Sequence, residues 1–107
     1  MTHSQLLAGS INEIKPGKMK RVIAPNGKRI LLCNVDGEFY AVDDQCTHED
    51  ASLYLGCLKG EKVHCSLHGG EFNVKTGKAV TEPAEVDLQT YPVSIENGNL
   101  FINLDSN

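Results

Sequence analysis

Short apolar segments alternate with turn signals along most of this chain. Three Asn-Gly or Asp-Gly pairs each separate two apolar-rich segments, and these dipeptides favour the positive φ angles of tight two-residue hairpin turns. The pattern therefore predicts antiparallel β-hairpins. The pairs are Asn26-Gly27, Asp36-Gly37 and Asn97-Gly98, and the strands expected beside them span residues 19–24, 29–35, 39–43, 91–95 and 100–104.

Helical signals are confined to one short segment. Ser10 and Glu13 have the spacing of a capping box, but Pro16-Gly17 ends this helix after about one turn. The sequence contains no internal repeat and no shift in composition. We therefore predict one all-β domain that spans residues 1–107.

The middle of the chain, about residues 44–83, is predicted to be its least regular part. Turns at Lys59-Gly60 and Thr76-Gly77 bracket two short strand-like segments, 62–66 and 71–74. Irregular loops held on a rigid sheet are common places for binding groups. Functional residues are therefore expected in this middle region.

Composition and charge narrow the classes of function. The chain has 107 residues, of which 40% are hydrophobic, and a formal net charge of −4. Nucleic acid is bound mainly by Lys and Arg, and the lysines are scattered without a basic stripe, so no nucleic-acid partner is expected. No apolar run is long enough to cross a membrane, and the first residues lack the features of an export signal. We therefore expect a cytoplasmic protein with no membrane partner.

The four cysteines fall into two kinds. In a chain without an export signal, metal binding or redox chemistry is a better first hypothesis than a disulfide scaffold. Cys46 and Cys65 are each followed by a histidine two or three residues later. Cys33 and Cys57 lie in apolar segments, where free cysteine behaves as a small hydrophobe, so both are expected to be buried thiols.

Two short motifs carry the chemistry. Cys46 and His48 form the first, and Cys65 and His68 form the second, so each offers one thiolate and one imidazole. In a Rieske [2Fe–2S] cluster both thiolates bind one iron and both imidazoles bind the other, which requires each loop to reach both irons. Gly69-Gly70 follows the second motif and allows the backbone to take positive φ close to a cluster.

Other readings of these motifs are weaker. A Cys2His2 zinc site usually pairs like with like, whereas each motif here mixes the two residue types. A catalytic Cys/His pair lacks an accompanying oxyanion or acid–base motif, and two such closely spaced Cys/His pairs in one small loop-rich region argue against chance structural residues. His64 is expected to be a surface or core histidine and not a ligand. The carboxylates that surround the first motif are expected to form a solvated acidic rim; they are Asp43, Asp44, Glu49 and Asp50.

Both motifs resemble the two boxes of Rieske proteins, and the resemblance covers nearly the whole chain. It is closest to the small Rieske ferredoxins of bacterial aromatic-ring-hydroxylating dioxygenase systems. The resemblance implies a Rieske fold of stacked antiparallel sheets with a loop-rich cluster-binding subdomain at one tip. It also implies one [2Fe–2S] cluster held by Cys46, His48, Cys65 and His68, covered by a third loop at residues 81–84.

The same resemblance implies a function in electron transport. The chain would be a monomeric carrier that takes single electrons from a flavin-containing, NAD(P)H-dependent ferredoxin reductase and delivers them to a terminal Rieske oxygenase. It would not be an enzyme by itself. Two alternatives stay open at this point: a small subunit of assimilatory nitrite reductase or another multi-subunit oxidoreductase, and a zinc-stabilised interaction module.

Overall fold

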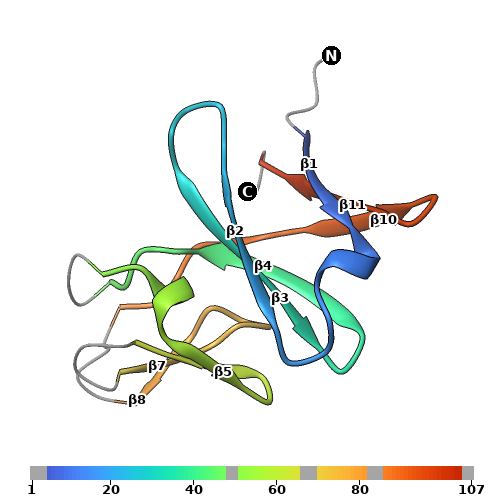
Figure 1. Ribbon diagram of the computed structural model, residues 1–107. Helices are drawn as coiled ribbons and strands as arrows, with labels where there is room; N and C mark the ends of the chain where they lie inside the picture. The colour runs from blue at the N-terminus through green and yellow to red at the C-terminus, as the bar shows by residue number, and fades with distance from the viewer. Residues whose placement is uncertain (1–4, 48–50, 66–69, 82–85, 105–107) are drawn as a thin grey trace.

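A computed structural model describes residues 5–47, 51–65, 70–81 and 86–104, which are built almost entirely from β-strands (Figure 1). The prediction of an all-β protein is confirmed. Two single-turn 3-10 helices, η1 (Ile11–Glu13) and η2 (Leu53–Leu55), interrupt the strands. The strands are β1 (Gln5–Ser10), β2 (Met19–Ile23), β3 (Arg29–Val35), β4 (Glu38–Asp43), β5 (Cys57–Lys59), β6 (Lys62–His64), β7 (Glu71–Asn73), β8 (Ala79–Thr81), β9 (Thr90–Tyr91), β10 (Val93–Glu96) and β11 (Asn99–Asn103).

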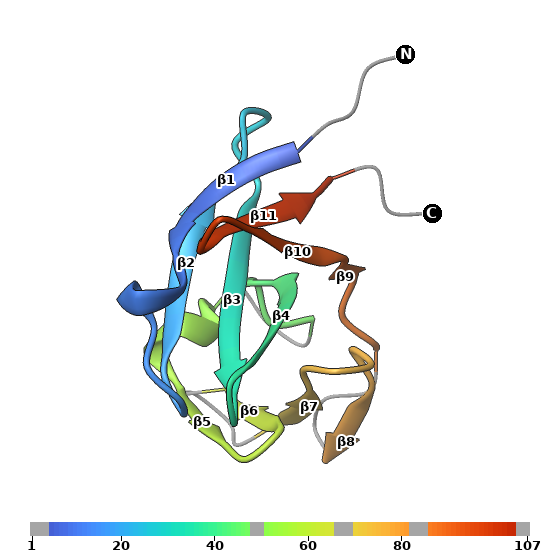
Figure 2. The ribbon, with the colours of Figure 1, turned by 90° about the vertical axis from the view of Figure 1, so that its right-hand side faces the viewer.

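These strands form three antiparallel sheets. Their orders are β1-β11-β10, β2-β3-β4-β9 and β5-β6-β7-β8. Figure 2 shows the β5–β8 sheet at the lower end of the molecule, with the other two sheets above it. No helix in the described part of the chain has the length and apolar character needed to cross a membrane.

Strand β3 is buried on both faces and connects two hydrophobic cores. Because side chains alternate along a strand, Leu31 and Cys33 face the β5–β8 sheet, whereas Ile30 and Leu32 face the β1-β11-β10 sheet. We call the two clusters of buried residues the lower core and the upper core. The lower core is Leu31, Cys33, Val35, Val42, Cys46, Leu53, Val63, Cys65, Phe72, Val74 and Leu88. The upper core is Ala8, Ile14, Ala24, Ile30, Leu32, Ala41, Tyr91, Leu100 and Ile102.

Two of the predicted hairpins have the turn that their sequence favours. At Asp36 and Gly37 the φ angles are 52° and 93°, and at Asn97 and Gly98 they are 53° and 78°. Positive φ at both central positions is typical of the type I′ turn, whose twist matches that of the strands it joins. The turns at both sites therefore fix the register of β3 with β4 and of β10 with β11.

The predicted capping box is also present. The Ser10 hydroxyl accepts a hydrogen bond from the Asn12 amide (3.2 Å), and the Glu13 carboxylate accepts one from the Ser10 amide (3.0 Å). The helix ends at Glu13, within the single turn that was expected.

Three strands were missed, and one predicted strand is divided. Strands β1, β5 and β8 have no hairpin dipeptide of the Asn-Gly type at their ends to announce them. The predicted strand 91–95 is interrupted at Pro92, which has no N–H to donate to a ladder. Tyr91 pairs with Ala41 in one sheet, whereas Val93 pairs with Ile102 in another. The chain thus changes sheets at Pro92.

The upper core generates a stability prediction. Ile102 is fully buried on β11, whereas Ile95, on the neighbouring strand β10, is 52% exposed. We expect Ile102→Ala to lower the free energy of unfolding by about 2–5 kcal/mol, because it removes buried methyl groups and leaves a cavity. The matched control Ile95→Ala should cost less than about 1 kcal/mol. Urea denaturation measures both, and equal losses would contradict the assignment of this core.

Candidate metal centre

Cys46 and Cys65 both lie in the lower core. Their exposed fractions are 3% and 4%, and both belong to the same cluster of buried residues as Phe72 and Val63. None of the four cysteines, all of which are described, forms a disulfide. Two thiols are thus held in one sheltered region at the lower end of the molecule.

The two predicted motifs form loops that are closed in the same way. The Cys46 amide donates to the Ala51 carbonyl at 2.8 Å, and the Cys65 amide donates to the Gly70 carbonyl at 2.7 Å. In both loops the bond joins a cysteine to the residue five positions later. The predicted ligands His48 and His68 belong to these loops but lie outside the described residues.

The hairpin formed by β5 and β6 brings the two loops together. Cys57, which follows the first loop, pairs with His64, the residue before Cys65. At Gly56 a Cβ atom would overlap the carbonyl oxygen of His64, so only glycine permits this approach. The described part of the region 44–83 is more regular than predicted, because it contains the four-stranded sheet β5-β6-β7-β8.

A buried carboxylate joins the two ends of the first loop. The Asp44 side chain is fully buried, where it accepts hydrogen bonds from the Ser52 hydroxyl (2.5 Å) and the Tyr54 amide (2.9 Å). The prediction that Asp44 belongs to a solvated acidic rim is therefore wrong. Sequence reasoning missed both Asp44 and Ser52, although the two-residue spacing of Asp44 and Cys46 places them on one side of an extended chain.

Of the other three carboxylates in the predicted acidic rim, the structure describes only Asp43. Asp43 is part-buried and accepts a hydrogen bond from the Tyr91 hydroxyl at 2.5 Å. Burial, followed by this hydrogen bond to Asp43, raises the pKa of Tyr91. Glu49 and Asp50 lie outside the described residues, so their place in a rim stays a prediction.

A third segment contacts the first loop. The Thr47 hydroxyl donates a 2.6 Å hydrogen bond to the Val86 carbonyl. Thr47 immediately precedes His48, and Val86 lies two residues after the predicted third loop at residues 81–84, of which only Thr81 is described. The segment that begins at Val86 is thus anchored beside the first motif.

His64 has a contact of its own. Its imidazole meets the carboxylate of Glu71, its cross-strand neighbour. The pKa of Glu71 lies below its usual value, first because the Thr81 hydroxyl donates a hydrogen bond to the carboxylate and also because His64 is near. That His64 is not a cluster ligand stays a prediction, and the contact with Glu71 gives this imidazole another role.

The remaining two cysteines behave differently from each other. Cys33 is fully buried on β3 as predicted, and burial, together with the charge of Asp44, raises the pKa of its thiol to about 12. Cys57 is exposed, so the prediction of a buried thiol there is wrong. On β5 it is Leu58 that packs against the lower core, which directs the neighbouring Cys57 to the opposite face.

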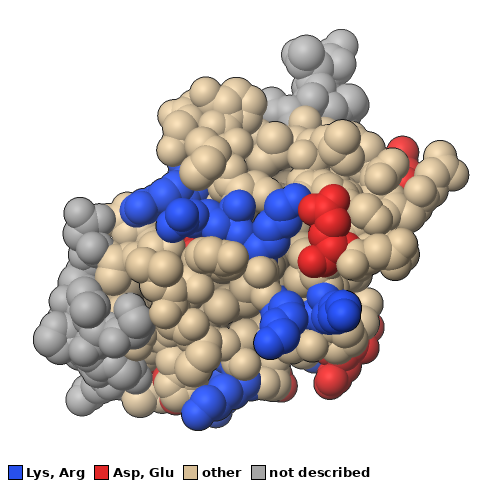
Figure 3. All heavy atoms as spheres, in the orientation of Figure 1, with Lys and Arg blue, Asp and Glu red and all other residues tan. Residues whose placement is uncertain are grey.

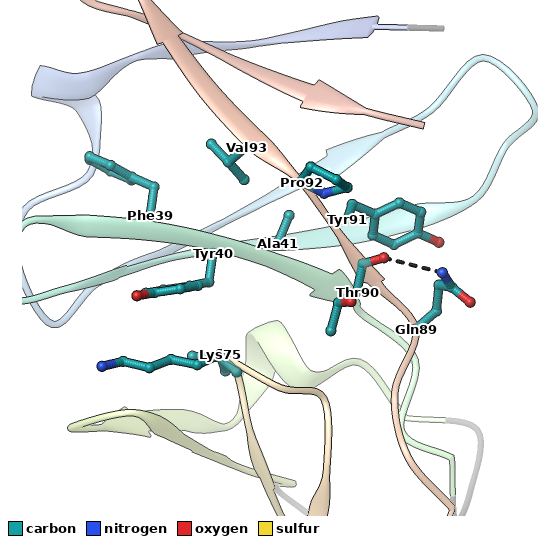
Figure 4. Close-up of a pocket in the computed structure, with 10 residues that line it drawn as sticks. Phe39, Tyr40, Ala41, Lys75, Gln89, Thr90, Tyr91, Pro92 and Val93 are labelled. Atoms are coloured by element: carbon teal, nitrogen blue, oxygen red, sulfur yellow. Dashed lines mark hydrogen bonds between the residues drawn. The ribbon is translucent and has the colours of Figure 1, made fainter. Parts of the chain in front are cut away.

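An open groove of about 520 Å³ lies beside β4 and the β9–β10 segment (Figure 4). Phe39 and Tyr40 line it from β4, Pro92 and Val93 line it from the β9–β10 segment, and Lys75 lies near the Tyr40 ring. Neither Cys46 nor Cys65, the two predicted ligands that the structure describes, lines this groove. It is therefore not the candidate metal centre.

Basic side chains gather on one face, which the sequence analysis did not anticipate. Residues 14–35 contain six of the ten Lys and Arg residues and no Asp or Glu, and Figure 3 shows Lys and Arg running across this view. Two of these side chains form ion pairs with carboxylates: Lys20 pairs with Glu13 at 2.7 Å, and Lys28 pairs with Asp43 at 3.3 Å. The expected absence of a nucleic-acid partner stays a prediction.

The buried thiols and the paired loops agree with one known family. Residues 4–92 match the Rieske [2Fe-2S] domain. The chain belongs to the Rieske family. The donor set of this Rieske domain also suits a cluster, because two cysteines in one core are the thiolate pair that one iron needs.

Relatives of this Rieske domain are ferredoxins. It is 41% identical, over 98% of the chain and 100% of the relative, to the ferredoxin component of the naphthalene 1,2-dioxygenase/salicylate 5-hydroxylase systems of Ralstonia sp.. It is 42% identical to the biphenyl dioxygenase ferredoxin subunit of Pseudomonas sp. (strain KKS102), over 89% of the chain and 87% of the relative.

Solved structures have the same fold. A chain in the complex of reduced oxygenase and oxidized ferredoxin in carbazole 1,9a-dioxygenase matches with a TM-score of 0.94 and 31% identity, covering 99% of this chain and 98% of that one. A protein described as an NADH-dependent nitrite reductase small subunit from Mycobacterium tuberculosis matches with a TM-score of 0.86 at 18% identity, covering 100% of both chains. The second likeness shows the fold alone.

The unequal burial of Cys33 and Cys57 generates a prediction about thiol reactivity. At pH 8, iodoacetamide should modify Cys57 in the folded protein and leave Cys33 unmodified, because Cys33 is buried and its pKa is raised to about 12. Peptide mass spectrometry identifies the modified site. Cys57→Ser should abolish the rapid labelling, and denaturant should expose Cys33. Labelling of Cys33 at the rate of Cys57 would contradict this arrangement.

Proposed function

We propose that this chain is a freestanding electron carrier that binds one Rieske-type [2Fe–2S] cluster. Cys46 and Cys65 would hold one iron, and His48 and His68 would hold the other. The whole chain, residues 1–107, would act as a single domain. Its cluster-binding region would be about residues 44–83.

The observation that carries this proposal is the matching closure of the two loops. Each places a buried cysteine at its start, with an amide-to-carbonyl bond five residues on, and each contains one histidine of the motifs. A zinc site would not need two loops that each mix a thiolate with an imidazole. A cluster in which each loop reaches both irons does need them.

The protein's own residues would shelter one side of the site and leave the other near solvent. When bound, a Rieske cluster accepts and releases one electron. The lower core packs around Cys46 and Cys65, so their iron would be the inner one. The histidine side would then be the outer one, from which an electron reaches a docked partner.

The partners follow from the chemistry and the relatives. Electrons would come from a flavin-containing, NAD(P)H-dependent ferredoxin reductase and would go to a terminal Rieske oxygenase that hydroxylates an aromatic ring. This proposal is supported by the named relatives, which are ferredoxin components of dioxygenase systems at about 40% identity. The carrier would be a monomer and would perform no reaction on a substrate by itself.

The first test concerns ligation. The purified protein should be red-brown and contain two irons and two acid-labile sulfides per chain, as a [2Fe–2S] cluster requires. His48→Ala and His68→Ala should each abolish or strongly destabilise the cluster, because each removes the only imidazole of its loop. Iron analysis and EPR of the reduced protein measure the outcome.

His64→Ala is the matched control for this test. His64 is next to Cys65 but contacts Glu71, so the cluster should persist in the variant. A colourless zinc protein would overturn the cluster. Loss of the cluster in His64→Ala, with retention in His68→Ala, would overturn the ligand assignment.

A second test concerns the docking face. Val86 is 64% exposed, and its carbonyl contacts Thr47 beside His48, whereas Ile95 is 52% exposed on β10. If the oxygenase docks at the histidine side, Val86→Asp should raise the apparent KM of the oxygenase for the carrier about fivefold or more, because a charge would be desolvated in the interface.

Ile95→Asp places the same charge on another exposed β-branched residue and should change this KM little. Steady-state oxygenase turnover at varied carrier concentration measures both. Visible spectra should show an intact cluster in each variant. Equal effects would mean that total charge, and not the histidine side, governs docking.

A further inference from the structure

The Asp44 carboxylate is a fully buried acidic group in the described residues, two positions before Cys46. Its Oδ2 accepts the Ser52 hydroxyl at 2.5 Å, and its Oδ1 accepts the Tyr54 amide at 2.9 Å. Burying a carboxylate is costly unless it is hydrogen-bonded and paired. This cost is offset because both carboxylate oxygens accept hydrogen bonds from the opposite end of the first loop.

Two arginines complete the charge balance around this carboxylate. The Arg21 guanidinium donates to the Ser52 hydroxyl at 3.1 Å and lies over the Tyr54 ring at 5.4 Å. Arg29 Nε lies 4.0 Å from Asp44 Oδ2. The hydrogen bonds from Arg21 to Ser52 and from Ser52 to Asp44 thus connect β2, in the β2-β3-β4-β9 sheet, to both ends of the first loop.

The backbone of the loop closes on this same point. The Leu53 amide donates to the Asp44 carbonyl at 2.7 Å, and Gln45 forms a β-bridge with Ser52. The next pair of residues toward the loop is joined by the hydrogen bond from the Cys46 amide to the Ala51 carbonyl. Asp44 and Ser52 therefore flank the loop that begins at Cys46 and ends at Ala51, and the hydrogen bond between their side chains joins its two ends.

We propose that Asp44 and Ser52 are positioning residues that hold the Cys46 loop closed, so that its thiolate is placed for the cluster before metal binds. This inference rests on the proposed function. The two ends of the loop then have little freedom left to lose on metal binding, which raises the stability of the bound state. A fixed negative charge on the cysteine side would also disfavour an added electron.

The test compares full-length variants that alter the bridge in different ways. Asp44→Asn keeps the shape and removes the charge, and Ser52→Ala keeps the charge and removes the donor. Both should release iron to a chelator about tenfold faster or more, since losing a hydrogen bond to a buried charged group has effects of this size. Ser52→Thr restores the hydroxyl and should restore slow release.

Two further readouts separate positioning from a general loss of structure. In the chain without iron, amide hydrogen exchange at Cys46 and Leu53 should quicken in Asp44→Asn and Ser52→Ala, while exchange at Ile102 in the upper core stays slow. The midpoint potential should rise in Asp44→Asn and change little in Ser52→Ala, because only the first removes a negative charge.

Asp43→Asn is the matched control. Asp43 is the adjacent carboxylate, but it bonds to Tyr91. Its variant should keep wild-type iron release, even where it lowers thermal stability. Iron release at the wild-type rate in both Asp44→Asn and Ser52→Ala, or equally fast release in Asp43→Asn, would overturn the inference. A wild-type chain that binds no iron would instead overturn the proposed function.

Discussion

The arrangement of this protein depends on one strand that is buried on both faces. Strand β3 presents Ile30 and Leu32 to the upper core and Leu31 and Cys33 to the lower core. Because neither face of such a strand meets solvent, its sequence is a continuous apolar run and does not alternate. Through β3, the sheet sandwich that gives the domain its stability also supports the loops that carry the candidate ligands.

Specific hydrogen bonds hold the described ends of the two loops. Each cysteine donates its amide to the residue five positions later, and hairpin β5–β6 places the second loop beside the first. Asp44 and Thr47 add side-chain bonds from the first loop to Ser52 and to the Val86 segment. Short strands and local bonds thus position the described parts of a region for which the sequence predicts irregular loops.

Local rules were enough to predict much of the fold. The dipeptides Asp36-Gly37 and Asn97-Gly98 fix φ at their own positions, and the Ser10–Glu13 capping box needs only neighbours in sequence. Strand β1 could not be predicted in this way, because its partner β11 lies at the other end of the chain. The identity of the pairing strand is a tertiary property.

The same distinction explains the outcome at the candidate site. The spacing of Cys46 and Cys65 relative to their histidines is local, and it was enough to identify the motifs. The burial of Asp44 and the exposure of Cys57 depend on which faces pack together, and both were predicted wrongly. The sequence around Asp44 does not indicate that Ser52, Arg21 and Arg29 lie close to its carboxylate in the folded chain.

The separation of the two cores has a consequence for how the protein matures in a cell. The upper core contains neither Cys46 nor Cys65 and is closed by strands from both ends of the described chain. Local stability can differ between such parts of one domain. We therefore expect a newly made chain to fold its upper half without iron and to present the thiol loops to whatever machinery supplies the cluster. Amide exchange of the apoprotein would reveal this form, in which the upper core and the hydrogen-bonded ends of the Cys46 loop are both protected, and a chain that stays unfolded until iron arrives would exclude it.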